Sequence, residues 1–238
     1  MDIESRFLLP EKEGGVYCLV GQAEGGCVHF CDLLNAPHIL VGGYSGSGKS
    51  VFLRGVILSL ILNYTPKEVG LVLVDSKQSG EFVVYDGVPH LLGKELSFAL
   101  SEMECRQSGD RENQSTIVVL IDEFSALSDE EKEMVEILIQ RGHGIGIHVI
   151  LATQRVTKEV VSPALKEGLC TVVSCALKEK KDSKFALGKK GAEKLLGNGD
   201  MLYKDRGGAI MRLQAGYVQE RDVQKIVRAV KEKYPCGG

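Results

Sequence analysis

Several features that would place the chain in a special class are missing from its sequence. No apolar run reaches the roughly 18 residues of a membrane-spanning helix, because Arg54 and Ser59 interrupt the most apolar stretch, residues 51–62. The N-terminus lacks the basic-then-apolar pattern of a secretory signal. Internal repeats and a linker rich in proline and serine are also missing. We therefore expect one globular domain with no membrane span.

The charge balance and the cysteine content exclude further classes. The 238 residues include 29 Lys and Arg against 32 Asp and Glu, which gives a formal net charge of −3. This balance excludes a protein whose whole surface is basic and binds nucleic acid, but it allows a local basic patch. The 7 cysteines are an odd number, and none of them form a C-x-x-C pair. We therefore expect reduced thiols and a cytoplasmic location.

From residue 38 onward, short apolar runs alternate with segments of helical period. The runs suit strands of a parallel sheet buried on both faces, and they lie at residues 38–41, 71–74, 117–121, 148–151 and 170–174. Between two of them, Ser128 and Glu131 have the spacing of a helix-opening capping box. The alternation predicts an α/β fold with a mostly parallel central sheet and helices on both faces.

Residues 1–35 have a different sequence pattern. Two short runs at residues 15–21 and 26–31 read as strands separated by glycine turns. We therefore predict a division into an N-terminal β-strand extension, residues 1–35, packed on a main domain of residues 36–238.

The segment GYSGSGKS at residues 43–50 matches the phosphate-binding P-loop pattern G-x-x-x-x-G-K-[ST]. A predicted strand precedes it and a long apolar helix follows, so backbone N–H groups and the helix N-terminus would face phosphate oxygens. Lys49 is expected to reach the β- and γ-phosphates, and the Ser50 hydroxyl is expected to ligate Mg²⁺. The residues predicted to bind ATP are Gly43, Ser45, Gly46, Ser47, Gly48, Lys49, Ser50 and Val51.

The glycine-rich turn at residues 43–50 has two alternative interpretations. A strand-to-helix turn that binds no ligand is the structural alternative. A dinucleotide-binding G-x-G-x-x-G is excluded, because Val51 stands where a third glycine should follow Gly46 and Gly48.

Two adjacent acids follow the apolar run at residues 117–121. Asp122 is expected to hold Mg²⁺ through water, and Glu123 to orient and polarise the attacking water. A strand that simply ends in solvated acids is the alternative, but the P-loop in the same chain favours the functional interpretation. A base beside the metal ligand also favours hydrolysis over transfer to a small-molecule acceptor.

Two more strand ends should meet at the same edge of the sheet. Asp75 follows the run at residues 71–74, while Thr153 and Gln154 follow the run at residues 148–151. A polar pair between the nucleotide strands would sense the γ-phosphate and pass the signal to a neighbouring subunit, so we include Thr153 and Gln154 among the candidate catalytic residues. An ordinary strand-exit turn is the alternative in each case.

Several motifs follow one another in a specific order along the chain. They are residues 37–51 (PHILVGGYSGSGKSV), 75–77 (DSK), 87–92 (GVPHLL), 122–124 (DEF), 146–155 (GIHVILATQR) and 191–203 (GAEKLLGNGDMLY). Their succession resembles the FtsK/SpoIIIE family of DNA translocases. The resemblance implies a RecA-like P-loop motor domain that hydrolyses ATP, assembles as a hexameric ring with ATP at subunit interfaces, and threads double-stranded DNA through its pore.

Some features depart from the family pattern. The sequence shows no counterpart of the family's membrane-spanning region or winged-helix module, and the segment between Leu92 and Ile117 is shorter. Where the family typically has Asp-Ser-Arg, residues 182–184 read Asp-Ser-Lys. A lysine is a point charge and cannot form the forked contacts of a guanidinium. We therefore expect that action on a neighbour's nucleotide is weakened or that it falls to Arg141 or Arg155, of which we favour Arg141.

DNA contacts are expected from lysines, because duplex affinity without sequence preference comes from cations at the phosphates. Residues 178–194 hold seven lysines against three acids. A solvated helix face is the alternative for this run. The segment QSGDRENQS at residues 107–115 has no apolar residue, predicts a mobile loop and is a further candidate. The candidate DNA-contacting lysines are Lys77, Lys180, Lys181, Lys184, Lys189 and Lys190.

Three other functions remain open at this stage. A motor for protein substrates is one, since secretion ATPases share this type of domain, although they usually carry several in tandem. A small-molecule P-loop kinase is the second, but the only arginine that residues 107–115 offer for a lid is Arg111. A nucleotide switch that does not hydrolyse is the third, and the presence of Glu123 argues against it.

Overall fold

A single mixed sheet organises the part of the chain that the computed structural model describes, which is residues 7–9, 14–109 and 115–235. This sheet has 10 strands. In order across the sheet they are β2 (Val28–Asp32), β1 (Tyr17–Ala23), β10 (Ile210–Gln214), β9 (Asp200–Lys204), β8 (Thr171–Cys175), β3 (His38–Gly42), β7 (Ile147–Thr153), β6 (Thr116–Ile121), β4 (Val69–Val74) and β5 (Leu91–Gly93).

The two halves of the sheet differ in strand direction. The strands from β8 to β5 pair in parallel, whereas β9, β10, β1 and β2 extend the sheet by antiparallel pairs. The central strands β3 and β7 are buried along their whole length. Burial on both faces explains why their sequences are nearly continuous apolar runs rather than alternating ones.

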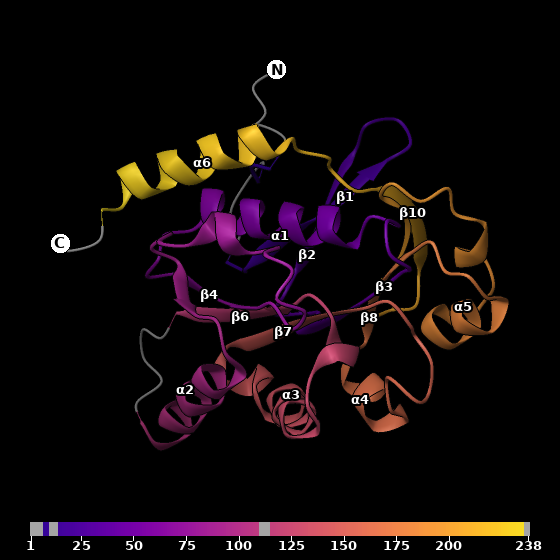
Figure 1. Ribbon diagram of the computed structural model, residues 1–238, viewed down its shortest axis with the longest axis horizontal. Helices are drawn as coiled ribbons and strands as arrows, with labels where there is room; N and C mark the ends of the chain where they lie inside the picture. The colour runs from indigo at the N-terminus through magenta and orange to yellow at the C-terminus, as the bar shows by residue number, and fades with distance from the viewer. Residues whose placement is uncertain (1–6, 10–13, 110–114, 236–238) are drawn as a thin grey trace.

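Helices cover both faces of the sheet (Figure 1). One face carries α1 (Lys49–Asn63) and α6 (Glu220–Lys233), and their apolar residues join the strands in one core cluster. The opposite face carries α2 (Leu96–Ser108), α3 (Asp129–Arg141) and α4 (Pro163–Gly168), with α5 (Lys180–Leu187) toward the antiparallel side. This arrangement confirms the predicted α/β fold with its mostly parallel sheet.

Local sequence signals explain where the helices begin. The Ser128 side chain accepts a hydrogen bond from the Glu131 N–H, and the Glu131 carboxylate accepts one from the Ser128 N–H, so the predicted capping box is present. Helix α6 buries Val223, Ile226 and Val227 on one face. Helix α1 is buried almost all round, because it lies between the sheet on one side and α6 on the other.

The predicted strands and helices are confirmed with small shifts at their ends, and three strands were missed. Strands β5, β9 and β10 were not predicted, because each is short and only partly buried and therefore lacks a long apolar run. The predicted mobile loop at residues 107–115 was wrong at its start, since α2 continues through Ser108. Residues 110–114 lie outside the described residues.

The N-terminal strands belong to the same sheet as the rest of the described chain. Strand β1 pairs with β10, and the Leu19 N–H donates a hydrogen bond of 2.9 Å to the Ser59 hydroxyl of α1. The predicted division between residues 35 and 36 stays a prediction. Within the described ranges, no helix has both the length and the apolar character needed to cross a membrane.

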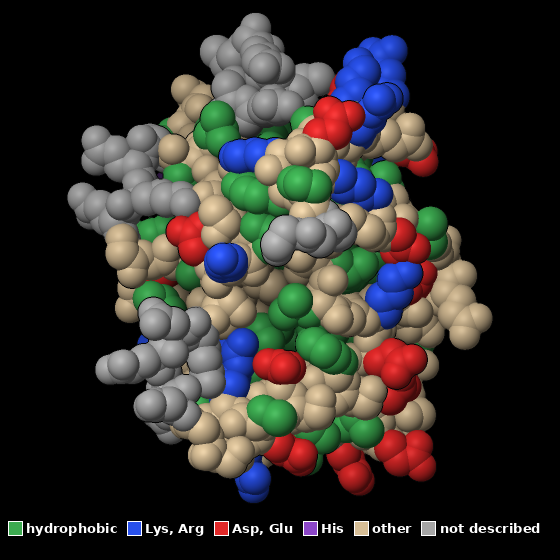
Figure 2. Space-filling model, turned by 90° about the vertical axis from the view of Figure 1, so that its left-hand side faces the viewer, with side chains coloured by type: hydrophobic (Ala, Val, Ile, Leu, Met, Phe, Trp, Pro, Cys, Tyr) green, Lys and Arg blue, Asp and Glu red, His purple; other side chains and the backbone are tan. Residues whose placement is uncertain are grey.

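Charges of both signs are distributed over the molecular surface. Figure 2 shows the face at the β5 end of the sheet, where basic and acidic side chains alternate with hydrophobic ones. No continuous basic area forms among the described side chains on this face. The view agrees with the balanced composition, which excludes a surface that is basic all over.

Two histidines are buried inside the sheet near the beginning of β3 and β7. The His38 Nδ1 accepts a hydrogen bond of 3.0 Å from the Val149 N–H, and the His148 Nδ1 lies 3.1 Å from the Pro37 carbonyl oxygen. Burial, reinforced by repulsion from the neighbouring imidazoles, lowers the pKa of His38 to about 3. Burial likewise lowers the pKa of His148 to about 4. Both side chains are therefore neutral in the folded protein at neutral pH.

This burial predicts a loss of stability in mild acid. An unfolded histidine has a pKa of about 6.5, so below that pH the unfolded state binds protons that the folded state refuses. Each histidine should lower the free energy of unfolding by up to about 1.4 kcal/mol per pH unit as the pH falls from about 6.5 toward 4. Urea unfolding of the wild type and of His148→Gln at several pH values measures this slope. The variant should show a shallower slope, and equal slopes would contradict the assignment.

Candidate active site

The P-loop lies between the end of β3 and the start of α1. Gly48 has φ of +116°, and a Cβ built on it would lie 2.3 Å from the Gly199 backbone nitrogen, so only glycine fits there. No side chain caps the N-terminus of α1, and its first turn contains no acidic residue. The N–H groups of this turn are therefore available to an anion, as the sequence predicted.

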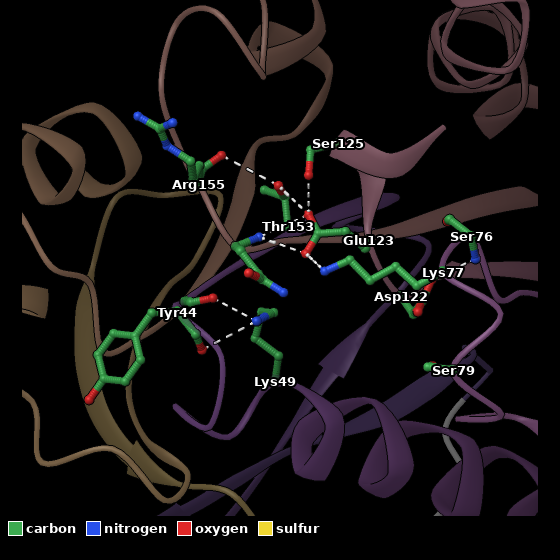
Figure 3. A network of polar contacts seen from close by, with 12 residues as sticks. Tyr44, Lys49, Ser76, Lys77, Ser79, Asp122, Glu123, Ser125, Thr153 and Arg155 are labelled. Atoms are coloured by element: carbon green, nitrogen blue, oxygen red, sulfur yellow. Dashed lines mark hydrogen bonds and ion pairs between the residues drawn. The ribbon is translucent and has the colours of Figure 1, made fainter. Parts of the chain in front are cut away.

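Lys49 is folded back onto the loop that would bind the phosphates. Its Nζ donates hydrogen bonds of 2.6 Å to the Gly43 carbonyl and 3.4 Å to the Tyr44 carbonyl (Figure 3). Burial lowers the pKa of Lys49, although the nearby Glu123 carboxylate opposes that effect. Because both acceptors are neutral carbonyls, a phosphate oxygen would be a stronger partner for this ammonium group.

Glu123 is the most heavily hydrogen-bonded side chain of the site. It is only 1% exposed, and it follows directly after Asp122 at the end of β6. Its Oε1 accepts hydrogen bonds from the Ser125 hydroxyl at 2.7 Å, the Thr153 hydroxyl at 2.9 Å and the Gln154 N–H at 3.0 Å. Its Oε2 accepts one from the Lys77 Nζ at 3.1 Å (Figure 3).

These donors decide the charge of Glu123. Burial alone would raise its pKa, but the donors from Ser125, Gln154, Thr153 and Lys77 outweigh burial, and the pKa of Glu123 is lowered. The carboxylate is therefore ionised at neutral pH, the state required of a base that polarises water.

The side-chain oxygens expected to hold Mg²⁺ lie close to the P-loop. Asp122 accepts a hydrogen bond of 2.8 Å from the Ser76 N–H, and burial raises the pKa of Asp122. Ser50 lies in the first turn of α1, and its exposed side chain lines the same pocket. A carboxylate and a hydroxyl are hard oxygen donors, so this donor set fits Mg²⁺ bound together with phosphates.

One pocket brings most of the predicted residues together. It has a volume of about 400 Å³ and is lined by Ser45, Gly46, Gly48, Lys49, Ser50, Val51, Lys77, Ser79, Glu81, Asp122, Glu123, Gln154, Asn198 and Tyr217. A larger hollow of about 690 Å³ lies at the end of the molecule containing β10, but none of the P-loop residues or catalytic carboxylates line it. The smaller pocket is therefore the candidate active site.

Some candidate residues lie away from this pocket. Arg141 is exposed at the end of α3, and the chain enters β7 soon after it, so Arg141 lies at the opposite edge of the sheet from the pocket. Arg155 is exposed beside Gln154, and its carbonyl oxygen accepts a hydrogen bond of 3.4 Å from the Thr153 hydroxyl. A role for either arginine toward a neighbouring subunit stays a prediction.

The candidate DNA-contacting lysines divide into two groups. Five are exposed on or just after α5: Lys180, Lys181, Lys184, Lys189 and Lys190. Lys77 differs from them, because its side chain, although 38% exposed, pairs with Glu123 inside the nucleotide pocket. The structure thus gives Lys77 a contact with the predicted base, and contact with DNA stays a prediction for all six.

Several pocket residues were not predicted from the sequence. Ser125 could have been suspected from its position two residues after Glu123, and Ser76 from its position after Asp75. Asp75 itself accepts hydrogen bonds from Ser79 and Gly80 and so organises the turn after β4. Asn198 lies in the motif at residues 191–203, which gave it no role in the pocket, and Tyr217 lies outside every motif; only the folded sheet brings the two to the P-loop.

Known proteins with sequences similar to this chain share one family name. The sequence model of the FtsK/SpoIIIE family matches residues 12–99. The protein named DNA translocase FtsK from Caldanaerobacter subterraneus subsp. tengcongensis is 34% identical over 90% of this chain and 35% of its own length. The protein of the same name from Leptospira interrogans serovar copenhageni is 32% identical over 94% of this chain and 27% of its own length. The chain thus spans about a third of these relatives.

Solved structures show the same fold at lower sequence identity. The cytoplasmic domain of the Type VII secretion ATPase EccC from Thermomonospora curvata superposes with a TM-score of 0.82 at 23% identity, over 97% of this chain and 32% of that chain. The pCW3 conjugation coupling protein TcpA, solved with ATPγS, gives a TM-score of 0.75 at 23% identity, over 92% of this chain and 71% of that chain. The fold is therefore that of P-loop ATPases, and most of the chain is similar in sequence to members of the FtsK/SpoIIIE family.

Proposed function

We propose that this chain is an ATP-hydrolysing motor that translocates double-stranded DNA. The observation that carries the proposal is the ionised Glu123 carboxylate at the end of β6, in one pocket with the P-loop lysine and Ser50. A buried catalytic base beside a P-loop is the arrangement that hydrolysis of a triphosphate requires. The relatives named DNA translocase, which match at least 90% of this chain, support DNA as the substrate that is moved.

The residues of the pocket have different roles in ATP hydrolysis. The N–H groups of the first turn of α1 bind the phosphates, and Lys49 exchanges its two carbonyl partners for phosphate oxygens. Ser50 and Asp122, which line the pocket, would hold Mg²⁺. When bound, this ion neutralises the charge that develops on the phosphates. Glu123 orients the attacking water and polarises it.

Glu123 must give up one hydrogen bond before it can engage a water. Its bonds to Thr153 and Gln154 come from the rigid, buried end of β7, whereas Lys77 lies on the exposed turn after β4. Ser125, the fourth donor, is also exposed, so Lys77 and Ser125 are the partners that move most easily. Thr153 and Gln154 couple the base to β7, which supports their role in sensing the γ-phosphate.

The assembly and the DNA contacts form a second part of the proposal. We infer a cytoplasmic hexameric ring in which ATP lies at subunit interfaces and Arg141, or else Arg155, reaches a neighbour's nucleotide. The exposed lysines on and after α5 would bind DNA phosphates, and six weak contacts around a ring add up to firm binding.

A motor for protein substrates is the second candidate. The observation that favours it is the TM-score of 0.82 with the cytoplasmic domain of a Type VII secretion ATPase. The two candidates share the same ATPase site, so they differ in what stimulates turnover rather than in the residues that hydrolyse ATP.

Glu123→Gln tests the assignment of the base. The amide keeps the size of the side chain but cannot take up a proton, so we expect the ATPase rate to fall by about 100-fold or more. Binding of a fluorescent ATP analogue should persist, because the P-loop is untouched. A variant that turns over ATP at the wild-type rate would show that another group is the base.

Linear duplex DNA should stimulate the ATPase, and the stimulation should weaken steeply as salt rises from about 50 mM to about 200 mM. Replacing Lys180, Lys181 and Lys184 together with Gln should reduce stimulation and flatten the salt dependence of DNA binding by about one unit of log–log slope for each lysine–phosphate interaction removed. A matched control replaces the exposed Lys225, Arg228 and Lys233 of α6 with Gln. Equal effects in the two triple variants would contradict a DNA site on α5, and no stimulation by DNA would favour the protein motor.

A further inference from the structure

One aromatic ring is exposed at the nucleotide pocket and has no role in the chemistry above. Tyr217 lies between β10 and α6 and is 67% exposed, although Ala215 and Val218 on either side of it are buried. Tyr217 lines the same pocket as the P-loop residues and the two carboxylates. A large aromatic surface left open to water at a binding pocket is the kind of surface that a planar ligand covers.

The backbone that carries this ring is tied to the P-loop through a short chain of hydrogen bonds. The Ala215 N–H donates to the Gly199 carbonyl at 2.8 Å, and the Gly199 N–H donates to the Ser47 carbonyl at 3.0 Å. The Gln214 side chain also donates to the Asn198 carbonyl at 2.8 Å. The backbone two residues before Tyr217 is therefore held against the P-loop.

The remaining lining of the pocket indicates which part of a ligand would reach Tyr217. Lys49, Lys77 and Glu123 line the part of the pocket that the proposed function assigns to the terminal phosphate, and Ser50 and Asp122 would provide oxygens for Mg²⁺. Asn198 and Tyr217 complete the wall from the β9–β10 side and carry no charge. An aromatic ring and an amide suit a heterocyclic base, because the ring can stack and the amide can both donate and accept hydrogen bonds.

We propose that Tyr217 and Asn198 form the base subsite of the nucleotide pocket. The ligand is then a nucleoside triphosphate whose base stacks on the Tyr217 ring, with the Asn198 amide at the edge of the base. This inference rests on the proposed ATPase function, which places the phosphates in the P-loop. A stacked base removes the apolar surface of the ring from water. Stacking therefore adds affinity that the phosphates alone do not supply.

Two variants and two ligands test this subsite. Calorimetric titration in the presence of Mg²⁺ measures the Kd of a non-hydrolysable ATP analogue and of inorganic tripolyphosphate, which has the phosphates but no base. Tyr217→Ala should weaken binding of the analogue by about 5-fold to 150-fold, the range expected for loss of one base–aromatic stack. It should leave the Kd of tripolyphosphate unchanged. Tyr217→Phe keeps the ring and should bind both ligands as the wild type does.

Leu196→Ala is the matched control, because Leu196 is 80% exposed nearby but lines the neighbouring hollow instead of the nucleotide pocket. It should change neither Kd. An unchanged Kd of the ATP analogue in Tyr217→Ala would overturn the base subsite, and so would an equal loss of affinity for tripolyphosphate. A wild-type protein that binds neither ligand would instead overturn the proposed ATPase function, so the two failures are distinguishable.

Discussion

The structure of the site depends on the hydrogen bonds around the Glu123 carboxylate. A carboxylate that is almost fully buried would be unfavourable as an anion unless donors surround it. Here the donors come from three places in the chain: Ser125 next to it, Thr153 and Gln154 at the end of β7, and Lys77 after β4. The same contacts that keep the group charged also hold these neighbouring strand ends in one arrangement at the nucleotide.

The antiparallel half of the sheet contributes to the same site from the other side. Gly199 precedes β9 and packs so closely on Gly48 that a Cβ on Gly48 would lie 2.3 Å from the Gly199 nitrogen. Its N–H also donates to the Ser47 carbonyl. The strands from β9 to β10 therefore do more than extend the sheet, since they brace the P-loop and bring Asn198 and Tyr217 to the pocket.

Charge is used differently in the pocket and on the surface. Inside, backbone carbonyls accept hydrogen bonds from the buried Lys49 and offset its cost of burial, while the partly exposed Lys77 pairs with the Glu123 carboxylate. Outside, the lysines on and after α5 are exposed, and one of them, Lys181, pairs with Glu179. A chain with a small net negative charge can in this way carry a concentrated basic segment.

The sequence by itself determined the parallel half of the fold and the core of the site. The apolar runs before Gly43, Asp122 and Thr153 identify strands buried on both faces, and the residues directly after such strands must meet at one edge of the sheet. Only the tertiary structure decided the positions of Lys77, Asn198 and Tyr217. Their neighbours in the pocket lie far away along the chain, and strands β9 and β10 contain charged residues (Asp200, Lys204 and Arg212) that leave no continuous apolar run. Local patterns report what each segment buries, whereas contacts between distant segments depend on how the sheet is ordered.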